Sequence, residues 1–164
     1  MRRLALSLSI TFLCSVCFAQ TPQITRADIT EFGEYTLDVQ KTDWTSANGI
    51  PQRTVGNVKL SQQTRVIHLH KDLHFGFRYT LVGSPEQSSV TVRMVMLYPP
   101  PGLLRPGEST TILRDESSRD RTIGLDYYRG YTIADDWMMV PGDWTFQIWY
   151  GDQLLTSQTF TLVQ

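Results

Sequence analysis

Apolar and polar side chains alternate with a period of two residues along much of this sequence. The clearest example is Trp144–Tyr150, where Trp144, Phe146, Ile148 and Tyr150 occupy every second position. Successive side chains of a β-strand point to opposite faces, so the pattern places these four residues on one buried face. No stretch beyond residue 19 keeps the helical spacing of three and four residues over ten positions. The alternation therefore predicts a chain built from β-strands.

Other segments extend this prediction along the chain. Phe75–Leu81 and Val90–Tyr98 alternate in the same way, and Pro99–Gly102 ends the second because proline donates no ladder hydrogen bond. Gly151–Asp152 is typical of a tight turn, after which Leu154–Val163 returns as a partner strand. Weaker patterns predict strands at Ile24–Val39 (broken near Gly33), Val55–Leu60, Thr64–His70, Thr110–Leu113 and Tyr127–Ile133.

The number and spacing of these segments favour one architecture. About seven to nine short strands separated by turn signals favour an all-β, immunoglobulin-like antiparallel β-sandwich, with a closed barrel as the alternative. The mixed charges of Arg114–Arg121 predict a solvated loop between two strands. We find no repeat or linker, so residues 20–164 are expected to form a single β-sandwich domain.

The first 19 residues predict a secretory signal peptide. Arg2 and Arg3 precede an apolar run from Leu4 to Phe18, and Ala19 closes a small-residue cleavage site. The run has 15 residues, fewer than the roughly 20 that a membrane anchor needs. A lipoprotein is the other alternative, but neither of the two cysteines in this region follows the small residues that lipidation requires. We therefore expect export to the periplasm or the extracellular medium.

Cleavage after Ala19 would change the composition that matters for function. Removal of 19 of the 164 residues would leave 145, with 13 basic and 16 acidic side chains. This mild negative balance gives no reason to expect a nucleic-acid partner. Both cysteines would leave with the leader, which excludes disulfides and thiolate metal ligands. No second apolar run is long enough to form a transmembrane segment.

Four short motifs, in this order, resemble a known family. They are Phe32–Tyr35, His74–Tyr79, the strand that runs from Val90 into Pro99–Gly102, and Val140–Phe146. In these motifs the chain is similar to the small bacterial family described as domain of unknown function 3859, over roughly residues 24–163. The resemblance implies one exported domain. It implies no catalytic residue, because the family has no established activity.

All three histidines fall within seven residues, which raises the question of a metal site. His68 and His70 would share one face of a strand, and His74 follows a turn that contains Asp72. Two imidazoles at this spacing can reach one zinc ion, so His68, His70 and His74 are candidate metal ligands. A solvated strand face that carries histidines is the favoured alternative. Thioethers suit copper, which adds four candidates: Met94, Met96, Met138 and Met139. No other cofactor is indicated.

Motifs for catalysis are weak in this sequence. Asp135, Asp136, Asp143 and Asp126 are the acidic candidates for hydrolysis of an envelope polysaccharide, but an adjacent pair in a loop does not define two carboxylates across a cleft. The sequence contains no phosphate-binding glycine loop, no His-Glu-x-x-His and no nucleophile elbow. An enzyme is therefore less expected than a binding protein.

Several apolar residues are expected on the outward faces of strands. Val95, Leu97 and Trp149 alternate out of phase with the core positions and form a candidate partner surface, unless a neighbouring loop covers them. Four further aromatic residues near predicted loops are candidates for a sugar-binding platform: Trp44, Trp137, Tyr127 and Tyr128.

These observations lead to one functional hypothesis with two alternatives. We expect a non-catalytic binding or structural protein that contacts an envelope protein partner or associates with itself. The alternatives are a zinc- or copper-binding module that uses His68 and His70, and a protein that binds or hydrolyses envelope polysaccharide.

Overall fold

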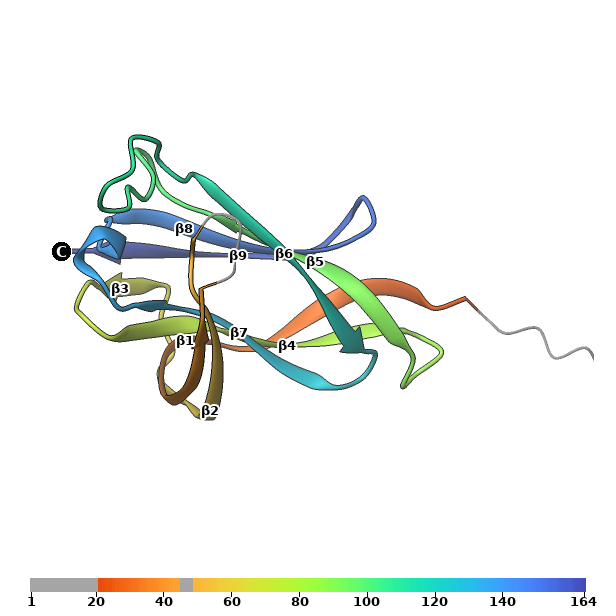
Figure 1. Cartoon of the computed structure of the whole chain (residues 1–164). Coiled ribbons are helices and arrows are strands. Elements are labelled where there is room, and N and C mark those ends of the chain that lie inside the picture. The colour runs from red at the N-terminus through yellow and green to blue at the C-terminus, as the bar shows by residue number, and fades with distance from the viewer. Residues whose placement is uncertain (1–20, 45–48) are drawn as a thin grey trace, which may run out of the picture.

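Two β-sheets packed face to face make up the structure, a computed structural model that describes residues 21–44 and 49–164 (Figure 1). One sheet has the order β2–β1–β4–β7, and its strands are β1 (Gln23–Asp43), β2 (Gln52–Gln62), β4 (Leu73–Ser84) and β7 (Asp126–Ile133). The other has the order β3–β9–β8–β5–β6, and its strands are β3 (Val66–His68), β5 (Ser89–Leu97), β6 (Arg114–Thr122), β8 (Gly142–Tyr150) and β9 (Gln153–Val163). All neighbouring strands are antiparallel except β3 and β9, which are parallel. The predicted β-sandwich is therefore confirmed, and the closed barrel is not.

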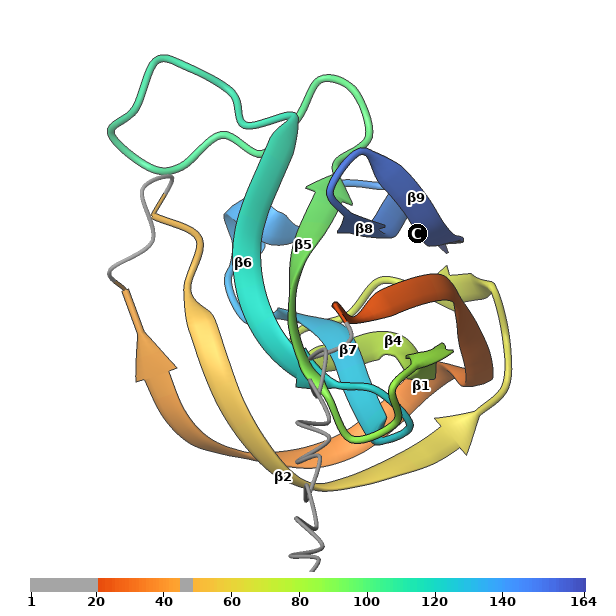
Figure 2. The same cartoon turned by 90° about the vertical axis from the view of Figure 1, so that its right-hand side faces the viewer.

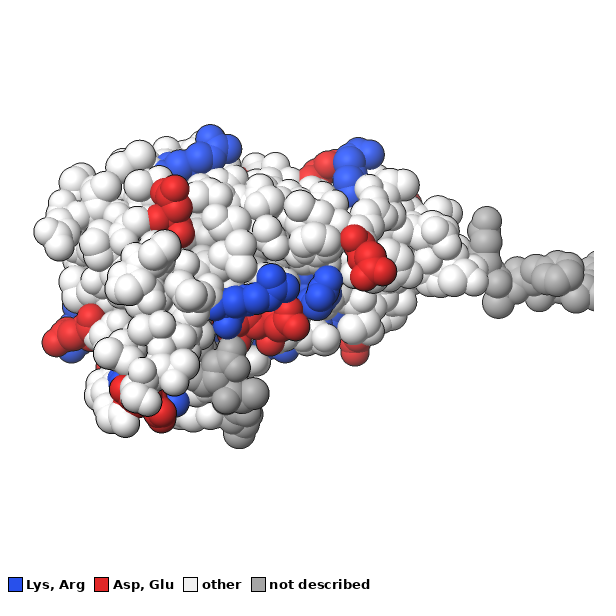
Figure 3. All heavy atoms as spheres, turned by 90° about the horizontal axis from the view of Figure 1, so that it is seen from above, with Lys and Arg blue, Asp and Glu red and all other residues white. Residues whose placement is uncertain are grey.

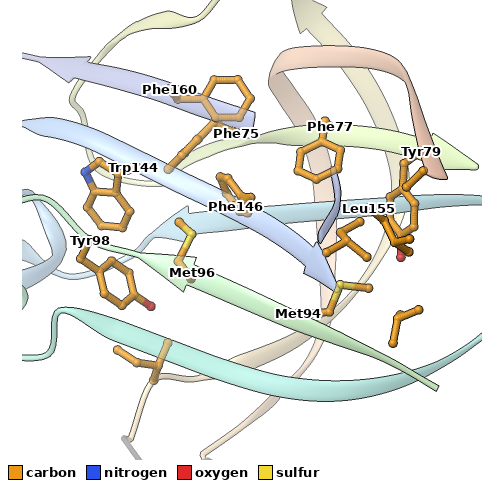
Figure 4. Close-up of a cluster of buried hydrophobic side chains, with 14 of the residues drawn as sticks. Phe75, Phe77, Tyr79, Met94, Met96, Tyr98, Trp144, Phe146, Leu155 and Phe160 are labelled. Atoms are coloured by element: carbon orange, nitrogen blue, oxygen red, sulfur yellow. The ribbon is translucent and has the colours of Figure 1, made fainter. Parts of the chain in front are cut away.

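Aromatic side chains from the two sheets meet in the core. Phe75 of β4 packs edge-to-face against Phe146 of β8, with ring centroids 5.7 Å apart, and against Trp144 at 5.8 Å. Figure 4 shows these rings between the sheets, with Met94 and Met96 beside them. Phe75, Trp144 and Phe146 are fully buried, as the two-residue alternation predicted. Burial of an aromatic side chain and its edge-to-face contacts together stabilise such a core.

The first strand is longer than predicted and does not break at Gly33. β1 runs from Gln23 to Asp43, with register shifts against both neighbours that absorb its curvature. Gly33 adopts φ +144°, and a Cβ there would lie 1.9 Å from the Gln62 carbonyl oxygen. Glycine thus allows the backbones of β1 and β2 to approach closely at this position, and the strand continues through it.

Two predicted strands are shorter or missing. The segment predicted as Thr64–His70 forms only β3, Val66–His68, so His70 lies beyond the end of the strand. The segment Thr110–Leu113 contributes a single bridge, between Leu103 and Ile112, and otherwise runs as a loop.

The prediction of a solvated loop at Arg114–Arg121 is wrong. These residues form β6, which pairs with β5 along its whole length. Side chains on one face are half-buried and those on the other are exposed; the half-buried ones are Asp115, Ser117, Arg119 and Arg121. The loop prediction failed because β6 is an edge strand with charges on both faces, so its pattern carries no apolar alternation.

Along one side of the sandwich, which we call the open side, an edge strand of one sheet faces an edge strand of the other. β6 and β7 are the edge strands of different sheets and are joined by a short turn, so they face each other. Figure 2 shows the end of β1 and the start of β2 rising beside β6 on this side. A short 3₁₀ helix, Asp136–Met138, connects β7 to β8 at one end of the sandwich.

No helix in residues 21–44 and 49–164 is both long and apolar enough to cross a membrane. The predicted signal peptide, residues 1–19, lies outside the residues that the structure describes and stays a prediction.

Candidate functional site

A polar pocket of about 170 Å³ lies on the open side, between β6, β7 and the start of β2. We call it the arginine pocket, after the charged and phenolic residues that line it: Arg53, Arg119, Arg121, Arg129, Asp115, Tyr98, Tyr128 and Tyr131. Buried surfaces between two sheets are usually apolar, so this concentration of polar groups distinguishes the pocket from the core beside it.

Strand alternation explains how charged side chains come to point between the sheets. On β6, Asp115 lies opposite Met96 of β5, and Arg121 lies opposite Val90, so these charged residues share the inner face of the sheet. Paired residues of neighbouring strands point to the same face. The inner face of β6 therefore continues the core face of β5 but carries polar groups, because it meets the pocket and not the opposite sheet.

Positive charge dominates the pocket lining. Four arginines line it against one carboxylate, that of Asp115. Burial raises the pKa of Asp115 above its usual range, although the positive charge of Arg129 opposes this shift. The outer surface differs: on the face shown in Figure 3, basic and acidic residues lie in small mixed groups separated by uncharged surface. The pocket lining therefore carries an excess of positive charge that the face in Figure 3 does not show.

Arg129 of β7 is the most unusual residue of the pocket. Its Nε is buried and has no hydrogen-bond partner, and no salt bridge of the described residues includes Arg129. Its guanidinium lies over the Phe146 ring, 5.8 Å from the centroid. Burial lowers the pKa of Arg129, while the negative charge of nearby Asp115 acts in the opposite direction. A buried guanidinium nitrogen without a hydrogen-bond acceptor costs stability, so Nε of Arg129 is a position where a ligand could supply one.

Two other arginines are held in place by protein contacts. Arg119 donates hydrogen bonds to the Ser118 carbonyl and to Oε1 of Gln52, which joins β6 to β2. Arg121 donates from Nε to the Tyr79 hydroxyl at 2.9 Å and from Nη1 to a backbone carbonyl at 2.8 Å. Its guanidinium also lies 4.6 Å from the centroid of the Tyr127 ring. These contacts orient the two guanidiniums, and Nε of Arg129 is the buried guanidinium nitrogen that lacks an acceptor among the described residues.

The hydroxyls of Tyr98, Tyr128 and Tyr131 are buried in the pocket. None of them forms a well-aligned hydrogen bond with the described residues, although those of Tyr98 and Tyr131 lie close enough to interact with each other. Burial raises the pKa of each hydroxyl above its usual value, so all three keep their protons at neutral pH. Gly130 leaves the space for one of them, because a Cβ there would lie 2.0 Å from the Tyr128 hydroxyl. Each unsatisfied buried hydroxyl costs on the order of 1–3 kcal/mol unless a water or ligand satisfies it.

These groups suit binding of a negative charge better than catalysis. Guanidiniums and phenolic hydroxyls donate hydrogen bonds to carboxylate or phosphate oxygens. Among the described residues, the lining contains no histidine and one carboxylate, that of Asp115. Its hydrogen-bond donors are therefore suited to contact the oxygens of an anion.

The histidine segment is not gathered into a cluster of ligands. His68 is exposed at the end of β3, and Nδ1 of His70 lies 2.8 Å from the Lys71 carbonyl oxygen. His74 is half-buried on β4, with Nδ1 2.9 Å from Oγ1 of Thr132. His70, Asp72 and His74 line one surface pocket, but the described residues contain no group of three or more side chains placed to hold a metal ion. Zinc binding here stays a prediction.

The methionines proposed as copper ligands lie in the hydrophobic core. Met94, Met96 and Met138 belong to the buried core cluster, and Met139 packs against it. Figure 4 shows Met94 and Met96 among aromatic and aliphatic side chains. Their thioethers fill space between rings, which is the ordinary use of methionine in a core.

The prediction that Val95, Leu97 and Trp149 form an exposed apolar surface needs correction. Val95 is fully buried, and Leu97 and Trp149 are half-buried. Trp149 donates from Nε1 to Oε1 of Gln147 at 3.0 Å, and Arg93 lies 5.3 Å from its ring centroid. Gln147 is the register partner of Val95. Gln147 and Arg93 thus lie beside Trp149 on this sheet face, and none of the three residues is exposed.

The four aromatic residues predicted to form a platform are separated. Trp44 is exposed at the end of β1, and Trp137 packs against the core. Tyr127 packs against the core and accepts a hydrogen bond from the Thr122 backbone, while Tyr128 alone lines the arginine pocket. They do not form one flat surface.

The acidic candidates for catalysis have structural partners or lie apart. Asp126 forms a 2.7 Å salt bridge with Arg78, and Asp143 accepts a 2.7 Å hydrogen bond from Thr161. Asp135 and Asp136 lie at the start of the 3₁₀ helix. The structure does not bring these four residues into a shared pocket.

Sequence reasoning missed the arginines of the pocket. Arg119 and Arg121 lie in the segment predicted as a loop, and Arg129 lies in a predicted strand that carries no binding motif. Arg114–Thr122 contains no glycine or proline, the strongest markers of a break, but its Asp, Ser and Thr residues favour a loop, so the local sequence does not signal the strand.

Comparisons with known proteins agree with this architecture. A family model described as "Domain of unknown function (DUF3859)" matches residues 25–162. A solved structure of an immunoglobulin-like protein from Pseudomonas aeruginosa is similar, with 20% identity and a TM-score of 0.60 over 88% of this chain and 98% of that chain. This likeness shows an immunoglobulin-like fold. None of the curated proteins compared with the chain matches it.

Proposed function

Because the chain belongs to the DUF3859 family, to which no function is assigned, we propose a function from its geometry: a non-catalytic module that binds a negatively charged ligand in the arginine pocket. The proposal rests on Arg129. Its buried Nε has no partner, and the groups around it are mainly hydrogen-bond donors. An anion would supply the acceptor that the protein does not.

A purely structural role explains the pocket less well. A fold that needed only stability would pair Arg129 with a carboxylate or replace it with an apolar residue. Buried polar groups that cost stability are typical of functional sites. Water molecules satisfying the same groups are the alternative, and ligand titration distinguishes the two.

The location that we propose is the cell envelope. The predicted signal peptide, with Arg2, Arg3 and the apolar run before Ala19, supports export. The ligand is then an acidic component of the envelope or an acidic group on a partner there. Mass spectrometry of the protein purified from a periplasmic extract tests this location, because export predicts a chain that begins at Gln20. A chain that keeps residues 1–19 and stays in the cytoplasm would contradict it.

Thermal unfolding in the presence of anions tests the binding proposal. The protein, expressed from its whole sequence, is heated with acetate, citrate, phosphate or sulfate at constant ionic strength, and with glycerol as a neutral additive. A ligand at about 100 times its Kd stabilises by about 2.7 kcal/mol, which raises Tm by roughly 5–10 °C for a domain of this size.

Substitution assigns any such shift to the pocket. Arg129→Met is expected to abolish the shift, because it removes the unpaired cation and keeps most of the side-chain volume. Arg26→Met is the matched control, because Arg26 is exposed, pairs with Asp28 at 2.7 Å and does not line the pocket. Equal shifts in the wild type and Arg129→Met would refute the proposal, and no shift with any of these four anions would exclude simple oxyanions as ligands.

A further inference from the structure

The pocket combines two kinds of unsatisfied group, and the combination narrows the chemistry of the ligand. Nε of Arg129 only donates, whereas the hydroxyls of Tyr98, Tyr128 and Tyr131 each donate and accept. A simple oxyanion offers acceptors and leaves the lone pairs of these hydroxyls unused. A ligand that carries hydroxyls beside its negative charge satisfies both kinds of group.

The buried nitrogen of Arg129 and the carboxylate of Asp115 indicate how negative charge on a ligand would be placed. Arg119 and Arg121 are hydrogen-bonded to protein groups, so Arg129 is the guanidinium whose buried nitrogen still needs an acceptor. One guanidinium pairs side-on with one carboxylate. Asp115 also lines the pocket, where it would repel a second negative charge and accept a hydrogen bond from a ligand hydroxyl. A singly charged, hydroxylated ligand fits this arrangement.

The size of the pocket limits the part of the ligand that enters it. Its volume of about 170 Å³ is similar to that of an engineered cavity of about 150 Å³ that holds benzene. A six-membered ring therefore fits inside, and further substituents or a longer chain would have to extend toward the opening.

From these three observations we propose that the arginine pocket binds a sugar acid, a six-membered sugar ring that bears one carboxylate. The carboxylate pairs with Arg129, and the ring hydroxyls meet Tyr98, Tyr128 and Tyr131. The inference rests on the proposed function, since it names the ligand class of the same site. Such a ring can come from a free monosaccharide or from a unit of an acidic polysaccharide.

Isothermal titration calorimetry with matched probes tests this inference. The probes are galacturonate, galactose (the ring without the carboxylate), cyclohexanecarboxylate (the ring without hydroxyls) and inorganic phosphate. Galacturonate is expected to bind at least tenfold more tightly than each of the other three. Trigalacturonate separates the two sources: tighter binding than galacturonate indicates a polymer, and weaker binding indicates the free sugar.

Two variants connect the binding to the named groups. Arg129→Met is expected to abolish binding of galacturonate. Tyr128→Phe keeps the aromatic ring and removes one hydroxyl. It is therefore expected to weaken the binding of galacturonate about tenfold and to leave the binding of cyclohexanecarboxylate unchanged. The Tyr128→Phe variant keeps the test informative if Arg129→Met does not fold.

These measurements distinguish a failure of the sugar-acid inference from a failure of the anion-binding proposal. If phosphate or cyclohexanecarboxylate binds as tightly as galacturonate and Arg129→Met abolishes that binding, the sugar-acid inference is wrong and the anion-binding function stands. If galactose binds as tightly as galacturonate, or if no probe binds to protein that unfolds cooperatively, both proposals are wrong.

Discussion

Arg119 of β6 donates a hydrogen bond to the side-chain oxygen of Gln52 on β2, and this contact joins the edges of two different sheets across the arginine pocket. β6 has no strand beyond it, and β2 is the far edge of the other sheet. A side-chain contact therefore holds one wall of the pocket, where no ladder hydrogen bonds are available.

Replacement of Gln52 by alanine is expected to loosen this wall. Loss of one hydrogen bond to a charged group costs about 1.5–3 kcal/mol when the site is dry and less at a half-exposed site such as this one. The expected result is a small decrease in the free energy of unfolding and faster amide exchange around residues 50–55. Hydrogen exchange by mass spectrometry measures this, with Gln40→Ala as the exposed control on β1. Exchange that matches the wild type at residues 50–55 would show that the contact does not hold the wall.

Replacement of Arg129 by methionine is expected to stabilise the fold while it removes binding. An unpaired buried cation costs free energy that an apolar residue does not, so the free energy of unfolding should rise by about 1 kcal/mol. Urea denaturation of the ligand-free protein measures the change, and Arg26→Met is expected to remain within about 0.5 kcal/mol of the wild type. A loss of stability in Arg129→Met would mean that the cation supports the fold.

Replacement of Phe75 by alanine is expected to cost about 3–5 kcal/mol of stability. Phe75 is fully buried and packs against four aromatic rings: Tyr131, Trp144, Phe146 and Phe160. The cavity left behind cannot be filled by neighbours that contact one another already. Urea denaturation measures this cost, and Leu125→Ala in an exposed turn serves as the control. A cost below about 1 kcal/mol would contradict a tightly packed core.

The pH dependence of stability should carry a contribution from His74. Burial, foremost, lowers the pKa of His74 below 6.5, with repulsion from Arg53 and His70, while Asp72 opposes the shift. The unfolded chain then binds a proton more readily than the folded chain. The contribution of neutral His74 to the free energy of unfolding is therefore complete above about pH 6.5. It is lost as the pH falls through the lowered pKa.

Comparison of two variants isolates this contribution. His74→Gln is expected to show a shallower loss of stability than the wild type as the pH falls below about 6.5, because the titrating group is gone. His68→Gln, at an exposed position, is expected to follow the wild-type curve. Parallel curves for the wild type and His74→Gln would exclude His74 as the source.

Zinc is expected to bind the histidine segment only modestly. His70, Asp72 and His74 line one surface pocket, but the described residues contain no three-ligand cluster, so we expect a Kd above about 1 µM. Calorimetry with zinc measures this affinity, and His70→Ala is expected to weaken it more than His68→Ala does. Absence of any heat would remove the metal-binding prediction.

The two-residue alternation was sufficient to predict the core strands. β4, β5 and β8 carry large apolar side chains at every second position because one of their faces packs against the opposite sheet. The same rule predicted that Phe77 and Phe146 point inward, and both are fully buried. It also predicted correctly that Val95 lies opposite the core face, but not that Val95 is covered.

Only the tertiary structure decided where the candidate site lies. The arginine pocket draws on Arg53, Arg119 and Arg129, which come from three strands in two sheets. Which strands form the sheet edges depends on long-range pairing, and a local pattern does not encode that pairing. The sequence by itself therefore determined which side chains avoid water, because burial follows from local alternation and hydrophobicity. The meeting of arginines and tyrosines in one pocket was decided by sheet order, which is a property of the whole fold.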